Sequence, residues 1–195
     1  MGIHMKTIYD RRSNEELTFV RTTSGNDVEV TARNAEGDLL VKSTKVDNTI
    51  KVMDYTDPDN PVDITEELEA QLEMTDDGIN NNTFDDGIRS ITWGNWTSKT
   101  VTFKTLNKTA VQIISYLLTE FPNIPAFIIN GLSGVFTSFS YPYATVKIRM
   151  RLGTDANYQY AQEEVTVWGR NSKTGTKYNV YGPNLWQQKK SLNRG

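Results

Sequence analysis

The stretch TAVQIISYLLTEFPNIPAFIINGLSGVF, residues 109–136, is the one long apolar run in an otherwise polar chain. Before Pro122 its apolar residues recur at spacings of three and four, which is the period of one helix face. Pro122 lacks an amide hydrogen and ends that helix, while Asn123 and Pro125 suit the start of a second one. The stretch therefore predicts two short apolar helices joined at a proline corner.

The run is too often interrupted to predict a stable single membrane span, which needs about 20 consecutive apolar residues. Glu120, Asn130 and the proline corner break it. Two interpretations stay open: the helices are the hydrophobic core of a small domain, or they form a hairpin that is packed away in one state and inserted into a membrane in another. The side chains that would insert are Ile113, Ile114, Leu117, Leu118, Phe127, Ile128 and Ile129.

The composition of the 195 residues argues against most common enzyme chemistry. Cysteine is absent, which excludes disulfides, zinc–thiolate sites and cysteine nucleophiles. The single histidine, His4, lies in MGIHM, and residues 1–5 are typical of a vector leader. Without it no Ser–His–Asp triad or histidine-ligated metal can form, and no nucleophile-elbow, P-loop or dinucleotide motif is present. We therefore expect a non-enzymatic protein with no cofactor and no metal site.

Acidic loops leave calcium open as an alternative. Asp54, Asp57 and Asp59 form one cluster of oxygen donors, and Asp76, Asp77, Asp85 and Asp86 form another. Neither follows the EF-hand pattern, and solvated loops commonly have this composition.

Charge divides the chain into two halves. Residues 1–90 carry 9 Lys and Arg against 20 Asp and Glu, and residues 91–195 carry 12 against 4. An acidic half ahead of a basic half indicates that one could neutralise the other, or that the basic half seeks an anionic surface.

The first half has the pattern of an antiparallel meander followed by a helix. Alternating apolar and polar residues separated by turn residues predict strands at 17–22, 27–33, 39–46 and 49–55. Residues 64–73 have apolar positions spaced by four and predict an acidic helix. Residues 6–74 would then form an acidic, pro-like region, and residues 75–87, rich in Asp, Asn and Gly, a linker.

The second half, residues 88–195, is predicted to be a basic β-sheet domain that contains the helical pair. Strands are expected at 101–106, 144–153, 158–170 and 176–182. The last three form a tyrosine-rich meander whose apolar face suits the two helices. The expected fold class is β-rich α+β, with antiparallel meanders and a short apolar helical pair packed on the C-terminal sheet.

A row of cations is expected on one face of strand 144–153, where Lys147, Arg149 and Arg151 alternate with apolar residues. Such a row could meet an anionic lipid surface or an envelope polymer. The alternative is a strand face that charge keeps soluble. No motif for specific nucleic-acid recognition is present.

The order of these segments resembles a known family. NDVEVTARNAEGDLLVKSTKVDNTIKVMDY (26–55), a polar spacer, the apolar Gly-containing segment 109–136 and the Tyr-rich basic region 146–182 resemble geobacillin-type large bacteriocins and related uncharacterised exported proteins of Gram-positive bacteria. The resemblance implies export, an acidic pro-like first half and a membrane-active or envelope-binding second half.

We therefore expect a secreted, non-enzymatic, bacteriocin-like antibacterial protein. The helical segment and the basic β-face would act on an anionic membrane or cell-envelope polymer. The alternative is a secreted structural or binding module of a Gram-positive bacterium, with the helices as plain core. The target, cleavage of residues 6–87 and the oligomeric state are open at this point.

Overall fold

The computed structural model describes residues 1–10, 14–68, 71–76, 84–85, 90–121 and 124–192. The chain forms two compact units, and each is built from two separate segments. Unit 1 comprises Met1–Glu69 and Lys104–Pro142, and unit 2 comprises Ala70–Phe103 and Tyr143–Gly195. The chain therefore passes from unit 1 to unit 2, back to unit 1, and again to unit 2.

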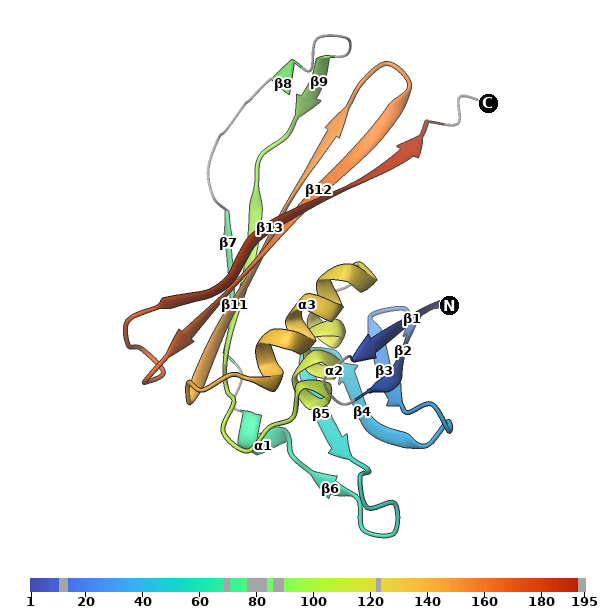
Figure 1. The fold of residues 1–195 in the computed structure, drawn as a ribbon. Coiled ribbons are helices and arrows are strands. Elements are labelled where there is room, and N and C mark those ends of the chain that lie inside the picture. The colour runs from blue at the N-terminus through green and yellow to red at the C-terminus, as the bar shows by residue number, and fades with distance from the viewer. Residues whose placement is uncertain (11–13, 69–70, 77–83, 86–89, 122–123, 193–195) are drawn as a thin grey trace. The chain divides into compact units, whose positions relative to one another are not determined.

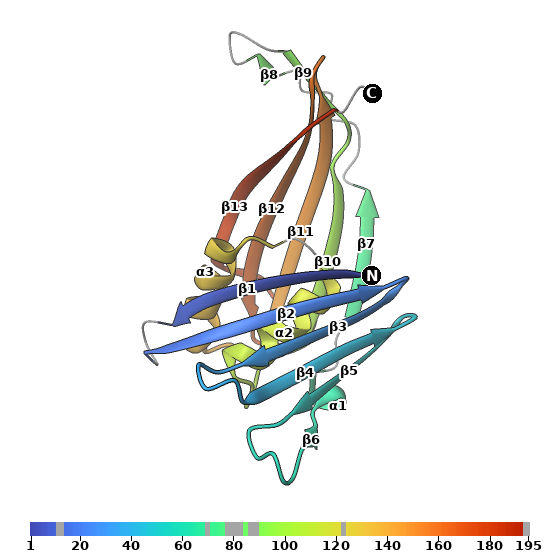
Figure 2. The same ribbon diagram turned by 90° about the vertical axis from the view of Figure 1, so that its right-hand side faces the viewer.

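Unit 1 contains a six-stranded antiparallel sheet whose strands follow one another in sequence order (Figure 2). The strands are β1 (Gly2–Asp10), β2 (Glu15–Ser24), β3 (Asp27–Arg33), β4 (Leu39–Val46), β5 (Thr49–Asp54) and β6 (Val62–Asp63). Strand β3 shows why these residues form a sheet with one covered face: Val28, Val30 and Ala32 are buried, and Glu29 and Thr31 between them are not. The four-strand meander expected from the sequence is thus present, with one strand added at each end.

Three helices complete unit 1: α1 (Thr65–Leu68), α2 (Ala110–Glu120) and α3 (Ala126–Thr137). Thr109 caps the N-terminus of α2 in a capping box. Its side-chain oxygen accepts a hydrogen bond from the backbone N–H of Gln112, and Gln112 Oε1 accepts one from the backbone N–H of Thr109. Pro122 and Asn123, the expected corner between the helices, lie outside the described residues.

The helical pair packs on the sheet of unit 1. Helix α2 contacts β2, β3, β4 and β5, and α3 contacts β1 and α2 (Figure 2). The β-rich α+β fold with antiparallel meanders and a short helical pair is confirmed. Both helices fall within unit 1, where polar side chains of α2 pair with side chains of β4 and β5.

Unit 2 is a seven-stranded sheet with the order β13-β12-β11-β10-β7, to which β9 adds by pairing with β11 and with β8. Its strands are β7 (Gln71–Asp76), β8 (Phe84–Asp85), β9 (Ser90–Trp93), β10 (Thr97–Lys104), β11 (Tyr143–Thr154), β12 (Tyr158–Arg170) and β13 (Tyr178–Ser191). The long strands β11, β12 and β13 form the expected basic meander (Figure 1).

Two segments differ from the sequence-based expectation. The acidic helix expected over residues 64–73 ends at Leu68, and Gln71–Asp76 pairs with β10 as a strand. This strand also takes in the start of the expected linker, residues 75–87, of which 77–83 and 86–87 lie outside the described residues. Residues 2–5 of the expected leader pair with β2. For Gln71–Asp76, backbone pairing with β10 prevails over the local helix propensity.

Candidate functional site

The side chains expected to enter a membrane are nearly all buried. Ile113, Ile114, Leu117, Leu118, Ile128 and Ile129 are at most 3% exposed. Phe127, at the start of α3, is 62% exposed. No helix in the described part of the chain is long and apolar enough to cross a membrane. In this conformation the apolar helices therefore contribute core, and one aromatic side chain is presented to solvent.

A polar seam, defined by residue pairs between α2 and the sheet, holds the helix in register. Lys45 Nζ donates to both carboxylate oxygens of Glu120 at 3.3 Å, and their side chains are 17% and 3% exposed. Thr119 Oγ1 donates to Ser43 Oγ at 2.8 Å. At the other end of the helix, Gln112 Nε2 donates to Asp54 Oδ2 at 2.5 Å. A paired buried charge and matched hydroxyls specify one position of α2 on the sheet.

Sequence reasoning did not identify this seam. The signal was present as Gln112, Ser115 and Thr119, which follow one another at spacings of three and four on one helix face, with Glu120 next to Thr119. This polar pattern was hard to recognise because the apolar residues of the same helix have the same period and are more numerous.

Two further groups adapt to burial at α2. Burial raises the pKa of the Tyr116 phenol far above its ordinary value, and the nearby Glu120 carboxylate adds to the shift. Arg21 Nε donates to the carbonyl oxygen of Leu118 at 3.0 Å, which places a cation at the negative end of the helix dipole. Burial lowers the pKa of Arg21. Arg21 thus supplies a hydrogen-bond donor to the C-terminal end of α2.

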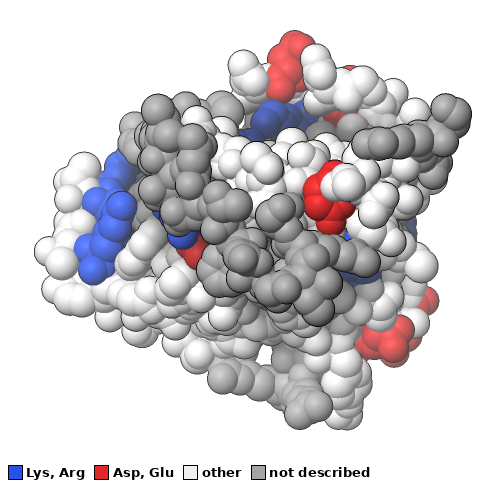
Figure 3. All heavy atoms as spheres, turned by 90° about the horizontal axis from the view of Figure 1, so that it is seen from above, with Lys and Arg blue, Asp and Glu red and all other residues white. Residues whose placement is uncertain are grey.

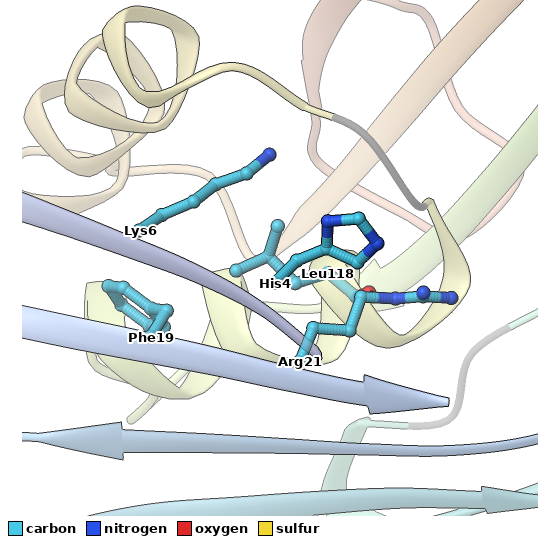
Figure 4. A pocket seen from close by; sticks show the side chains of 5 residues that line it. All are labelled: His4, Lys6, Phe19, Arg21 and Leu118. Atoms are coloured by element: carbon cyan, nitrogen blue, oxygen red, sulfur yellow. The ribbon is translucent and has the colours of Figure 1, made fainter. Parts of the chain in front are cut away.

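A small pocket lies beside this capped helix end. Figure 4 shows its lining: His4 and Lys6 from β1, Phe19 and Arg21 from β2, and Leu118 from α2. Its volume of about 30 Å³ has room for about two water molecules and is far below the roughly 150 Å³ of a cavity that holds benzene. It is too small for an organic ligand, and His4 lies in the expected leader.

In unit 2, the predicted cation row on β11 is largely engaged within the sheet. Arg149 donates from Nε and Nη2 to the two oxygens of Glu164, at 2.7 and 3.2 Å. Arg151 Nε donates to Gln162 Oε1 at 2.8 Å. Lys147 is half-buried and also has a partner. Strand β12 therefore supplies polar partners for the row.

Both arginines also stack on tryptophans. Arg149 Cζ lies 4.4 Å from the ring centroid of Trp96, and Arg151 Cζ lies 4.5 Å from that of Trp93 and 4.6 Å from that of Trp96. Such stacks attract the cation to the negative ring face. Trp93 lies against Gly153, since a Cβ at that position would come 2.5 Å from its ring. Through these contacts the two arginines of β11 hold the segment with Trp93 and Trp96 against the sheet.

Two lysines repeat the cation–aromatic pairing at the two ends of β12. Lys189 Nζ lies 3.7 Å from the ring centroid of Tyr158, and Lys177 Nζ lies 5.0 Å from that of Trp168. Tyr158, Gln162, Glu164 and Trp168 share one face because side chains alternate along the strand. We call this face of unit 2 the cation–aromatic face. Its residues are Trp93, Trp96, Arg149, Arg151, Tyr158, Tyr160, Gln162, Glu164, Trp168, Lys177 and Lys189.

Other candidate chemistry finds no support in the geometry. Glu163 and Glu164 are adjacent on β12, so their side chains leave opposite faces of the sheet. No group of three His, Cys, Asp or Glu among the described residues could hold a metal ion. Asp54 and Asp57 accept hydrogen bonds from their own loop, and Asp77 and Asp86 lie outside the described residues. On the face shown in Figure 3, charged side chains form separate groups.

Comparison of the chain with protein families, curated proteins and solved structures finds no match.

Proposed function

We propose that the protein is an exported, non-enzymatic binding module that attaches to the anionic cell envelope of Gram-positive bacteria through the cation–aromatic face of unit 2. The observation that carries the proposal is the gathering of four cations and five aromatic rings on one side of one sheet. Residues 143–195 carry nine Lys and Arg against three Asp and Glu, which complements a polyanion.

Burial of the helices supports the binding-module interpretation over membrane insertion. Inserting α2 into lipid would separate Glu120 from Lys45 and Gln112 from Asp54, leaving polar groups without partners in hydrocarbon. These groups suit a permanent position on the sheet.

Co-sedimentation with purified Gram-positive cell walls tests the proposal. We expect the full chain to sediment with intact walls, to remain in solution with walls stripped of their anionic polymers, and to lose binding as salt rises, because ion pairing at a surface is screened. Equal binding to intact and stripped walls would reject the anionic envelope as the target.

A membrane-active, bacteriocin-like antibacterial protein is the second candidate. The exposed Phe127 favours it, because an exposed aromatic side chain can make a first contact with lipid. In this candidate the acidic strands cover the apolar helices until a target is met. Dye release from anionic liposomes by the full chain, reduced in Phe127→Ser, would support it. Absence of release at concentrations that saturate the walls would exclude it.

A further inference from the structure

We propose that the two lysine–aromatic pairs at opposite ends of β12, Lys189 over Tyr158 and Lys177 over Trp168, bind an extended phosphodiester polymer of the poly(glycerol phosphate) type that lies along the strand. This inference rests on the proposed function and names the ligand class and the residues that contact it.

The arginines in the middle of the face are less suited to this role. Two donors of Arg149 are already bound by Glu164, and Arg151 is stacked on two tryptophans and bound to Gln162. A phosphate that bound to either guanidinium group would have to displace a carboxylate, an amide or an aromatic ring that already contacts it. The arginines therefore act as positioning residues that hold the tryptophan segment in place.

The lysines have the opposite setting. Lys177 and Lys189 are exposed residues, and neither forms an ion pair with a carboxylate of the described residues. The Lys177 ammonium lies against the ring of Trp168, and the Lys189 ammonium lies against that of Tyr158, with the Tyr160 ring at 5.9 Å. These ring contacts restrain the long side chains. The side of the ammonium away from the ring keeps donors for an anion. Ring and ammonium thus form a positioned phosphate contact.

Spacing along the strand distinguishes a polymer from a single phosphate. Tyr158 and Trp168 are ten residues apart on β12, which corresponds to about 33 Å at the rise of a β-strand. One phosphate group reaches one lysine only. A linear polyanion that spans both gains from the second contact being intramolecular, so affinity should rise steeply once the chain is long enough.

The covered rings favour a polymer without bases over a single-stranded nucleic acid. Binding of single strands relies on aromatic faces that are open for base stacking. Here the ammonium groups of Lys177 and Lys189 lie on the rings of Trp168 and Tyr158. Phosphate contacts remain possible, and stacking would require the lysines to move away.

The test is a binding titration of the full chain with deacylated poly(glycerol phosphate) chains of graded length. We expect glycerol phosphate and short chains to bind weakly, and affinity to increase sharply above a length of about 30 Å. Lys177→Gln and Lys189→Gln should each weaken binding of long chains about five-fold, and the double variant about 25-fold. Lys190→Gln, on the neighbouring residue and the other sheet face, is the matched control and should bind as the unaltered chain does.

The outcomes separate the inference from the function on which it rests. If the unaltered chain binds long polymer but both lysine variants bind equally well, or if affinity does not depend on length, the inference is overturned while the envelope proposal stands. Tighter binding of single-stranded DNA of equal charge also overturns it. If the unaltered chain binds neither polymer nor walls, both fall. Circular dichroism of each variant confirms that these exposed substitutions leave the fold intact.

Discussion

One ion pair from each unit is compared by its exposure to solvent: Lys45–Glu120 in unit 1 and Arg149–Glu164 in unit 2. In unit 1, Lys45 and Glu120 are buried between helix and sheet, with side chains 17% and 3% exposed. In unit 2, Arg149 and Glu164 lie on a sheet face and are 33% and 18% exposed. A deeply buried pair costs desolvation and defines one packing arrangement, whereas a partly exposed pair costs less and organises a surface. The difference teaches that the Lys45–Glu120 pair specifies how α2 packs, whereas the Arg149–Glu164 pair organises the sheet face that we propose as a binding surface.

The largest expected effect tests whether the helices are core. Leu117→Ala removes a fully buried side chain of α2, and we expect it to lower the free energy of unfolding of unit 1 by about 2–5 kcal/mol. Phe127→Ala, at the exposed start of α3, should change it by less than about 0.5 kcal/mol. Denaturation followed by circular dichroism measures both. Equal effects would mean that α2 does not stay packed on the sheet.

Removing the buried cation should produce the next largest loss. Lys45→Met leaves the Glu120 carboxylate buried without its ammonium, and we expect a cost of about 2–3 kcal/mol. Lys51→Met is the matched control, because Lys51 and Asp63 are mostly exposed and 3.9 Å apart. Urea denaturation of the two variants measures the difference. A loss as small as that of the control would contradict a structural role for the seam.

A glycine in each unit gives effects of opposite sign. In unit 2, Gly153→Ala would bring a Cβ 2.5 Å from the Trp93 ring, and we expect about 1–3 kcal/mol of destabilisation. In unit 1, Gly134→Ala meets nothing within 4 Å and lies in α3, so it should stabilise by about 0.5–1 kcal/mol. All four tryptophans belong to unit 2, so their fluorescence follows its unfolding, and circular dichroism of the helices follows unit 1. If Gly153→Ala left the free energy of unfolding of unit 2 unchanged, Trp93 would not lie against β11.

Alkaline pH should weaken unit 1 through Tyr116. Burial raises the pKa of this phenol in the folded chain, whereas the unfolded phenol ionises near pH 10. Above that pH the unfolded state binds fewer protons, so the stability present below pH 10 declines by up to about 1.4 kcal/mol per pH unit. Tyr116→Phe should remove this part of the decline in pH-dependent denaturation. An unchanged slope would assign the decline to other groups.

The smallest expected effect concerns the stacked arginines. Arg151→Lys keeps the charge but loses the planar group that stacks on both tryptophans, and we expect a loss of about 0.5–1 kcal/mol in unit 2. The tryptophan emission maximum should shift to longer wavelength as Trp96 gains water. Arg33→Lys, at the exposed end of β3 in unit 1, is the control and should leave the emission unchanged.

Local pattern was sufficient to predict most strands and both main helices, but not their partners. Residues 27–33, 39–46 and 158–170 alternate clearly, and strands occupy those ranges. The sequence pattern could not show that Thr119 and Glu120 match Ser43 and Lys45, since such contacts join positions far apart in the chain.

The same limit applies to the candidate site. The alternation of Lys147, Arg149 and Arg151 predicted a cation row on one strand face, and the register of β11 with β12 is consistent with it. The stacking on Trp93 and Trp96 depends on how the intervening strands pair, which the sequence pattern does not encode. Lys177 and Lys189 had no periodic signal at all, because each is defined by an aromatic ring on another strand.

The interleaved order of the two units has a consequence for biosynthesis. The strands of unit 1 are complete at Asp63, but the helices that contact their apolar face begin only at Ala110 and end at Thr137. During translation the strands are synthesised before the helices that pack on them. A small antiparallel sheet with an uncovered apolar face has only marginal stability by itself. A chain released before Thr137 should stay protease-sensitive, because unit 1 reaches its stable form only after both helices have been synthesised.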